Sequence, residues 1–295
     1  MRANKIFAWR SICYEESMHA PRSPEMIEPD LLMLAYRSGI FPMADSREDP
    51  EVFWVEPRLR AILPLDGFHL SHSLARTLRR GRFTVTCNAA FSEVMNACAA
   101  PRAPQAGDEE EEDDDGSRSW ISHRIQASYE NLHRLGNAHS IECWQDAADG
   151  SGKWLVGGLY GVGFDRVFCG ESMFSRVPDA SKVALAWLVA ALRKGGAVLL
   201  DCQFMTPHLA SLGAVEMTQQ RYVDLLQAAQ SAPVSAAGAA SAAGAGAADG
   251  LGAASGAGDV LALPDAFGLL LEDAASAGLA SSPGKFIAQA LTQTS

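Results

Sequence analysis

The stretch that decides the fold is WLVGGLYGVGFDRVFCGESMFSRVPDASKVALAWLVAALRKGGAVLLDCQ, residues 154–203. Its first half contains two apolar runs, 154–162 and 167–174, which a turn-type break separates at 163–166. Short runs rich in Val, Phe and Tyr and bounded by glycine or aspartate are typical of strands. The first half of the stretch therefore predicts two strands joined by a short turn.

The second half predicts a helix followed by a third strand. Asp179 is a candidate N-cap, apolar residues recur at helical spacing over 183–192, and Gly195 ends the pattern. Residues 197–204 are then almost wholly apolar, as in a buried strand. The order strand, strand, helix, strand indicates the centre of a layered core of helices and strands.

Three polar side chains interrupt these apolar runs. Asp201 and Gln203 stand two residues apart in the last run and so point to the same face of a strand, and Glu171 interrupts the strand before the helix. A carboxylate is costly to bury without a partner, and a shared polar site at the centre of the sheet explains all three. The alternative is structural: each carboxylate could bond to backbone or to an arginine such as Arg166 or Arg176.

The composition limits the class of protein. Hydrophobic residues make up 48% of the 295 residues, enough for a full core. No apolar run approaches the roughly 18 residues of a membrane span, and Arg10, Glu15 and Glu16 interrupt any signal-peptide core. The six cysteines are scattered without a C-x-x-C pair, which is typical of reduced thiols in a cytoplasmic protein. The histidines form no ligand cluster, so we expect no metal site.

Charge is unevenly distributed along the chain. The net charge is −11, but residues 108–115 are an unbroken run of acids, and residues 231–295 carry five acids against one lysine. By contrast, residues 58–82 carry six arginines against one acid, Asp66. The acidic total therefore does not exclude nucleic acid as a partner, because the distribution of charge matters more than its sum.

Part of this arginine-rich stretch falls on one expected helix. Arg76, Arg79 and Arg80 have i, i+3, i+4 spacing and form one face, and Arg82 follows the helix. Such a face could hold a phosphate backbone. The alternative is a solvated helix end, where arginines in the last turn are favoured by the helix dipole.

Helix and strand signals alternate along the rest of the body. The expected helices are 28–39, 71–80, 88–99, 122–135, 207–212 and 221–230. The expected strands are 53–55, 61–65, 83–86 and 139–144, and residues 39–43 predict a rigid apolar turn. This alternation indicates an α/β or α+β core with a mixed sheet.

Three segments differ in composition from the body. Residues 101–119 form a polar, acid-rich insertion that we expect to be disordered. Residues 231–258 are nearly all Ala, Gly and Ser, which is typical of a flexible linker. Residues 259–295 regain apolar character and predict a weakly helical C-terminal tail, with weak helices around 265–272 and 284–292.

Short pieces of the sequence occur in the order found in a known family. They are GIFP at 39–42, LDGFH at 65–69, SWI at 119–121, LGNAHSIE at 135–142, LVGGLYG at 155–161, FCGESMFS at 168–175, DASK at 179–182, DCQ at 201–203 and HLASLG at 208–213. Over residues 28–226 the chain thus resembles the leucyl/phenylalanyl-tRNA–protein transferases. GESMFS together with DCQ is highly specific, whereas each other piece alone would be weak.

The resemblance implies an α+β fold with a small N-terminal domain, here 1–66, on a GNAT-like acyltransferase domain with a mixed sheet, here 67–230. It implies transfer of Leu, Phe or Met from aminoacyl-tRNA to the N-terminal Arg or Lys of a protein, which marks that protein for the N-degron pathway. Aminoacyl-tRNA and such proteins are the implied partners. No cofactor, metal or membrane is implied, and we expect a monomer in the cytoplasm.

The resemblance also implies roles for individual residues. Trp120 and Tyr129 would contact the 3′-terminal adenosine of the tRNA. Met43 stands where some members have a tryptophan that helps to clamp this adenosine. The arginine face would hold the acceptor stem, whose RNA helix is read by shape and phosphate; its residues are Arg76, Arg79, Arg80 and Arg82.

The donor amino acid would bind in an apolar pocket next to the polar centre. The implied lining is Leu159, Phe168, Leu185 and Leu188. Leu188 stands where some members have phenylalanine, which would reshape the floor of the pocket. Such a pocket would bury an unbranched-β side chain and crowd Ile and Val. Without the resemblance, these four residues would be interpreted as ordinary core.

The three polar residues are the candidate catalytic centre. The attacking amine must be neutral, and we expect Gln203 to hold it through its carbonyl oxygen while Asp201 orients Gln203 and helps to remove the proton. A ribose hydroxyl of the tRNA could carry the proton instead. Glu171 would bind the cationic acceptor or the adenosine. Glu171 and Phe168 face opposite sides of a regular strand, so serving one site would need a bulge, for which Gly170 is the natural place.

Two other classes of function are compatible with the sequence. A GNAT enzyme that uses acyl-CoA needs a Gly-rich loop that opens a helix and grips pyrophosphate. Here the glycines at 157, 158, 161 and 163 lie within and just after a strand instead. A non-catalytic tRNA-binding protein is the second alternative, and the presence of all three polar residues favours an enzyme over it.

Overall fold

The computed structural model describes residues 25–100, 119–147, 149–231 and 261–292. The expectations of a signal-free N-terminus, a disordered insertion and an Ala/Gly/Ser linker fall almost wholly outside these ranges. In the described part the expected α+β class with a mixed sheet is confirmed. No helix of this part is long and apolar enough to cross a membrane.

A seven-stranded mixed sheet forms the centre of the molecule, with strand order β4-β5-β6-β7-β8-β3-β9. All neighbouring strands are antiparallel except β7 and β8, which are parallel. The strands are β3 (Leu59–Ile62), β4 (Thr84–Cys87), β5 (Ala138–Asp146), β6 (Lys153–Phe164), β7 (Val167–Ser175), β8 (Leu199–Gln203) and β9 (Val215–Thr218). The opening stretch of the sequence therefore supplies three adjacent strands of this sheet.

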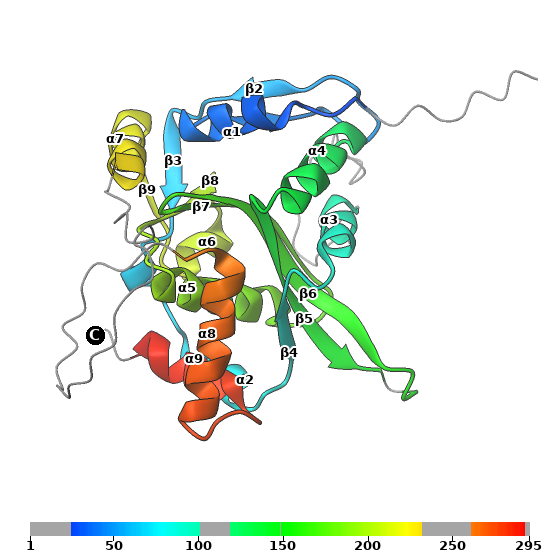
Figure 1. Cartoon of the computed structure of the whole chain (residues 1–295), viewed down its shortest axis with the longest axis vertical. Helices are drawn as coiled ribbons and strands as arrows, with labels where there is room; N and C mark the ends of the chain where they lie inside the picture. Colours follow the sequence, from blue (N-terminus) through cyan, green and yellow to red (C-terminus); the bar gives the residue numbers. More distant parts are fainter. Residues whose placement is uncertain (1–24, 101–118, 148, 232–260, 293–295) are drawn as a thin grey trace, which may run out of the picture.

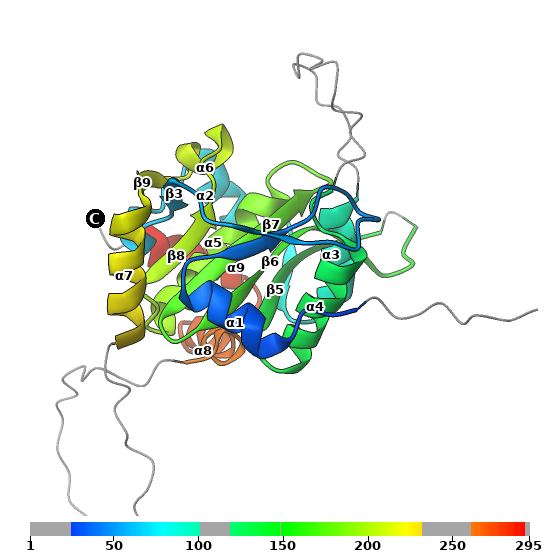
Figure 2. The same cartoon turned by 90° about the horizontal axis from the view of Figure 1, so that it is seen from above.

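Helices cover both faces of the sheet (Figures 1 and 2). One face packs against η1 (Leu65–Gly67), α2 (His72–Arg79), α5 (Ala180–Lys194), α8 (Leu263–Ser276) and α9 (Pro283–Thr292). The other face packs against α1 (Pro29–Arg37), α3 (Phe91–Ala99), α4 (His123–Arg134) and α7 (Gln219–Ser231). The short α6 (Pro207–Ser211) follows β8.

A second, two-stranded antiparallel sheet lies beside α1. It consists of β1 (Phe41–Met43) and β2 (Phe53–Val55). The prediction of a rigid apolar turn over 39–43 is therefore wrong for 41–43, because these residues pair with the distant segment 53–55. Gly39 with φ of +80° makes the turn that precedes β1.

Helix α5 is buried nearly all round, because it lies between the sheet and the α8–α9 hairpin (Figure 1). The rings of Trp187 in α5 and Phe267 in α8 lie 5.1 Å apart, and Lys194 pairs with Asp273 at 2.8 Å. Helices therefore form near both places in the C-terminal tail where the sequence predicted weak ones, and they pack on the body.

The parallel strands β7 and β8 stay paired only over residues 167–169 and 199–201. Beyond that point each continues without the other, so the sheet opens at its centre. A bulge in β7 lies at this opening: Tyr160 of β6 pairs with Ser172 and Gly161 with Gly170, which leaves Glu171 as the extra residue. The irregularity expected next to Gly170 is thus present in the strand.

Candidate active site

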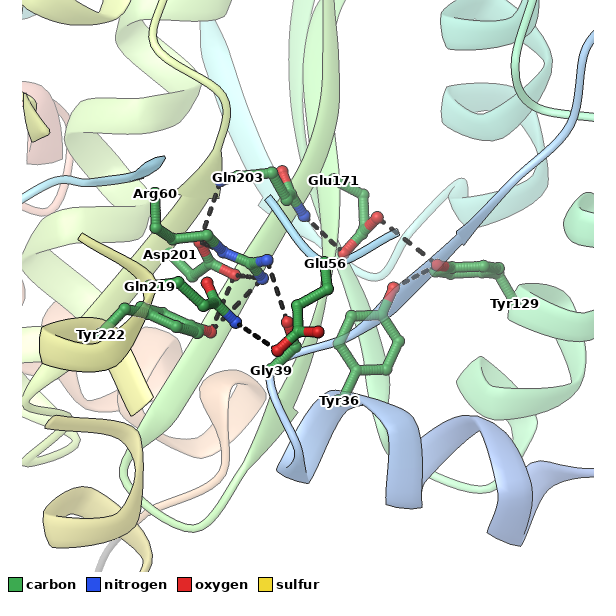
Figure 3. A network of polar contacts seen from close by, with 10 residues as sticks. All are labelled: Tyr36, Gly39, Glu56, Arg60, Tyr129, Glu171, Asp201, Gln203, Gln219 and Tyr222. Atoms are coloured by element: carbon green, nitrogen blue, oxygen red, sulfur yellow. Dashed lines mark hydrogen bonds and ion pairs between the residues drawn. The ribbon is translucent and has the colours of Figure 1, made fainter. Parts of the chain in front are cut away.

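Glu171 and Gln203 meet across the opening between β7 and β8 (Figure 3). The side-chain Nε2 of Gln203 donates to Oε1 of Glu171 at 2.8 Å. The bulge turns Glu171 towards the face that carries α1 and α4, where Tyr129 donates its hydroxyl to the other carboxylate oxygen at 3.4 Å. The Tyr36 hydroxyl in turn bonds to the Tyr129 hydroxyl. The candidate catalytic residues Glu171 and Gln203 are therefore in direct contact.

Burial changes the acidity of Glu171. Burial raises the pKa of this carboxyl and the nearby charge of Asp201 adds to the rise, whereas the Tyr36 and Tyr129 hydroxyls and Arg60 oppose it; the net pKa is about 8. Glu171 is therefore largely protonated at neutral pH in the free protein. No cation pairs with it among the residues that the structure describes.

Asp201 has a different environment, because it forms a buried ion pair with Arg60. Arg60 Nε lies 2.8 Å from Oδ1 of Asp201 and Arg60 Nη2 lies 2.5 Å from Oδ2. The Tyr222 hydroxyl donates to Oδ2 at 3.1 Å, and the backbone N–H of Gln203 donates to Oδ1 at 2.9 Å. Burial lowers the pKa of Arg60, but the charge and hydrogen bonds of Asp201 outweigh this effect and leave the pKa above its ordinary value.

The structural alternative of an arginine partner is thus realised for Asp201, but with an arginine that the sequence did not suggest. Arg166 donates to the backbone oxygen of Gly196 and Arg176 to that of Leu155, so neither contacts a carboxylate of the centre. Arg60 belongs to the arginine-rich stretch that suggested a basic surface, yet it is only 1% exposed.

Sequence reasoning missed three residues of the centre, Tyr36, Arg60 and Tyr222. Arg60 carried a usable signal, since it stands between two apolar residues directly before the expected strand 61–65. The two tyrosines carried none beyond their places in amphipathic helices. Burial raises the pKa of Tyr222 well above its usual value, and the charge of Asp201 adds to this, so its hydroxyl stays a donor.

The implied lining of the donor pocket lies on the other face of the sheet. All four residues are buried in the core around α5; they are Leu159, Phe168, Leu185 and Leu188. The Phe168 ring lies over Gly161 of β6. Phe168 also lines a cavity of about 300 Å³, whose other walls include the end of α5 and residues 261–263. The three leucines do not line this cavity.

The implied adenosine contacts lie near the small sheet. The backbone N–H of Ala44 donates to the backbone oxygen of Trp120 at 3.2 Å, so Trp120 lies beside Met43 of β1. Trp120 and Met43 are both partly buried. Tyr129 is fully buried in the apolar stripe of α4, between the rings of Tyr36 and Tyr160, so its hydroxyl reaches Glu171 while its ring is core.

The arginine face is exposed on α2 and directly after it, and forms no ion pair among the described residues. Its members are Arg76, Arg79, Arg80 and Arg82. Helix α2 lies beside α9, at the end of the molecule away from α1 and the small sheet (Figure 1). No group of three or more potential metal ligands occurs in the described ranges.

The fold and the site define a class: an α+β protein whose central parallel strands diverge around a buried cluster of two carboxylates, an amide and an arginine. Models of the leucyl/phenylalanyl-tRNA protein transferase family match residues 62–227, and those of its N-terminal domain match residues 25–58. The chain therefore belongs to the leucyl/phenylalanyl-tRNA–protein transferase family, and it is an aminoacyltransferase.

Individual relatives agree with this assignment. A leucyl/phenylalanyl-tRNA–protein transferase of Novosphingobium aromaticivorans is 62% identical over 278 residues, which cover 92% of this chain and 98% of the relative. That of Rhizorhabdus wittichii is 54% identical over 214 residues, or 72% of this chain and 79% of the relative. Among solved structures, FemX matches with a TM-score of 0.40 at 12% identity, covering 66% of this chain and 70% of FemX.

Proposed function

We propose that this protein transfers leucine or phenylalanine, and also methionine, from aminoacyl-tRNA to the N-terminal Arg or Lys of acceptor proteins, which marks them for the N-degron pathway. The observation that carries the proposal is the hydrogen bond between Gln203 and Glu171 across the opening of the central sheet. Family membership supplies the reaction type, and the polar centre supplies groups suited to it.

Gln203 and Glu171 have different proposed roles towards the attacking amine. The Nε2 group of Gln203 is engaged by Glu171, so its carbonyl oxygen is left to accept an N–H of the attacking amine. The α-amine has a pKa near 8 and must be neutral to attack. Because the pKa of Glu171 is raised to about 8, only a minor fraction of it is ionised at neutral pH, and this carboxylate form, which grows as the pH rises towards 8, can accept a proton from such an amine. As the amide bond forms, the ester C–O bond breaks and the ribose oxygen that leaves takes up this proton; a neighbouring ribose hydroxyl of the tRNA could relay it.

The donor ester is already activated, so the protein needs chiefly to position the amine on the carbonyl. In this proposal the donor side chain passes through the opening between β7 and β8 into the apolar core around α5. Its lining is Leu159, Phe168, Leu185 and Leu188, which would bury an apolar side chain at about 1.5–3 kcal/mol. The 3′-terminal adenosine would bind near Trp120, Met43 and Tyr129.

The proposed domain division is a small N-terminal domain over 1–66 and a GNAT-like acyltransferase domain over 67–230. The mixed sheet with one diverging parallel pair supports the second. An acyl-CoA-dependent activity is less well supported, since in the part of the chain that the structure describes no glycine-rich loop opens a helix next to the centre. We further propose a monomer that acts in the cytoplasm without a cofactor.

The decisive experiment is transfer of labelled leucine from charged tRNA to a peptide that begins with Arg. We expect labelled product with this peptide and with a Lys-initiated one, and none with the same peptide acetylated at its N-terminus. Labelled acetyl-CoA serves as the competing donor. Transfer of acetyl groups without transfer of leucine would assign the protein to the acyl-CoA class, and no transfer from either donor would leave a tRNA-binding protein.

The tRNA site is tested through its salt dependence. Replacing Arg76, Arg79 and Arg80 together by Ala should weaken tRNA binding and reduce the slope of log K against log salt by about 2–3, because each phosphate contact contributes about 0.7–0.9. Arg134→Ala, at the exposed end of α4, is the control and should leave the slope unchanged. An unaltered slope in the triple variant would place the acceptor stem elsewhere.

A further inference from the structure

Arg60 is held rigidly in the centre of the molecule. Its guanidinium carbon lies 4.8 Å from the centroid of the Phe41 ring and 4.4 Å from that of the Tyr222 ring, and its Nη1 donates to the backbone oxygen of Gly39 at 3.1 Å. Its Nε and Nη2 donate to the two oxygens of Asp201, and Nη2 also donates to the Tyr222 hydroxyl at 3.4 Å. A planar guanidinium that packs on two aromatic rings and has all three nitrogens hydrogen-bonded has little freedom to turn. Arg60 therefore fixes the carboxylate of Asp201 in space.

The hydrogen-bonding capacity of Asp201 is taken up by the protein. Its two oxygens accept four hydrogen bonds, two from Arg60, one from Tyr222 and one from the backbone of Gln203. An ionised carboxylate offers about four acceptor positions. No position is left from which Asp201 could take a proton from an incoming amine without first breaking one of these bonds.

The fourth of these bonds acts on the backbone of Gln203. This residue has φ of +54°, in the left-handed region that residues with a Cβ rarely adopt. Such a conformation persists where surrounding contacts hold it, and it is common at functional sites. Here the holding contact is the N–H of Gln203 on Oδ1 of Asp201 at 2.9 Å. The conformation ends β8 and directs the amide of Gln203 towards Glu171 (Figure 3).

We propose that Arg60 is a positioning residue of the transfer reaction. It acts through Asp201 to hold Gln203 in its left-handed conformation, and Asp201 itself takes no part in proton transfer. The inference rests on the proposed function and refines it. Gln203 binds the amine, Glu171 is the protein group that accepts the proton, and the pair of Arg60 and Asp201 is their support. This support requires a side-chain oxygen at residue 201 that accepts the hydrogen bond from the backbone N–H of Gln203. It does not require the negative charge of Asp201.

Three variants separate support from acid–base chemistry. Arg60→Met leaves the Asp201 charge buried without its cation, so the carboxylate moves and Gln203 loses its conformation; we expect kcat to fall about 100-fold. Adding Asp201→Asn removes the uncompensated charge but keeps a side-chain oxygen for the N–H of Gln203. The double variant should therefore recover to within about 30-fold of the wild-type kcat, with an unchanged KM for leucyl-tRNA and an unchanged pH profile. Arg166→Met, which loses a hydrogen bond to the backbone oxygen of Gly196 and none to the polar centre, is the control and should keep the wild-type kcat.

The outcomes are measured as single-turnover transfer of leucine to an Arg-initiated peptide. A double variant more than about 30-fold below wild type, or an Arg60→Met variant as active as wild type, overturns the inference. If Arg60→Met does not fold, the double variant is compared with wild type by the same criterion. Wild-type protein that transfers no leucine would instead overturn the proposed function, so the two failures are distinguishable.

Discussion

Glu171 is a carboxyl group in surroundings that disfavour its charged form. Burial raises its pKa to about 8, whereas the same group in an unfolded chain titrates near 4.3. Between these two values the native protein binds a proton that the unfolded chain has released. The free energy of unfolding that this group contributes is therefore fully present below pH 4 or so and is lost as the pH rises through about 8.

This linkage predicts the behaviour of Glu171→Gln, which cannot ionise. The free energy of unfolding of wild type should fall relative to that of the variant between pH 5 and about 9, as measured by urea denaturation. Tyr160→Phe is the matched control, because burial raises the pKa of Tyr160 well above 10 and the hydroxyl does not titrate in this window. If the difference in free energy of unfolding between wild type and Glu171→Gln did not change with pH, the raised pKa would be contradicted.

At the scale of elements, the bulge in β7 depends on a glycine of its neighbour. Gly170 lies in the bulge, but a Cβ there would meet nothing closer than 3.6 Å, and its φ is not in the left-handed region. Gly161 on β6 has no such room. A Cβ there would lie 2.2 Å from the backbone oxygen of Cys169 and 2.4 Å from the ring of Phe168. The glycine of β6 therefore allows the two strands to approach and Phe168 to lie flat on them.

The pair Gly161→Ala and Gly170→Ala tests this account. Gly161→Ala should lower the free energy of unfolding by about 1–3 kcal/mol, since the added methyl forces Phe168 or the strand to move. Gly170→Ala should change it by less than about 1 kcal/mol, because alanine adopts the local backbone without strain. Urea denaturation of both variants is the measurement. Equal losses would show that the bulge, and not the close approach of β6, sets the constraint.

At the scale of the whole molecule, the α8–α9 hairpin completes the core although it lies beyond the residues that match the family, 62–227. It covers the outer side of α5, and Gly284 of α9 approaches α2 so closely that a Cβ would lie 2.4 Å from the backbone oxygen of Leu78. The hairpin therefore touches both the helix behind the implied donor pocket and the helix of the arginine face. We expect it to unfold together with the body in one transition.

Phe267→Ala is the test of this integration. The ring is 5% exposed and packs on Trp187, so its removal should lower the free energy of unfolding by about 3–5 kcal/mol. Leu271→Ala on the same helix is the control and should cost clearly less, because Leu271 is 39% exposed. Trp fluorescence and far-UV circular dichroism should report coincident transitions. An early, separate transition of the hairpin would contradict a single cooperative core.

The sequence by itself predicted a core of helices and strands with a mixed sheet, the three strands and the helix of residues 154–203, and, as one of two alternatives, a shared polar site of Glu171, Asp201 and Gln203. These features depend on local periodicity and on residues close together in the chain. The sequence also showed that α5 is apolar, but not that α8 and α9 cover it.

Only the tertiary structure decided the partner of Asp201. Strand β3 pairs with β8 across a separation of 141 residues between Arg60 and Asp201, and no local pattern reports which strand becomes a neighbour. The same pairing places Arg60, one of the six arginines of residues 58–82, in the core. An ion pair forms where the topology brings two charges out of water together, so its members are known only once the sheet order is known.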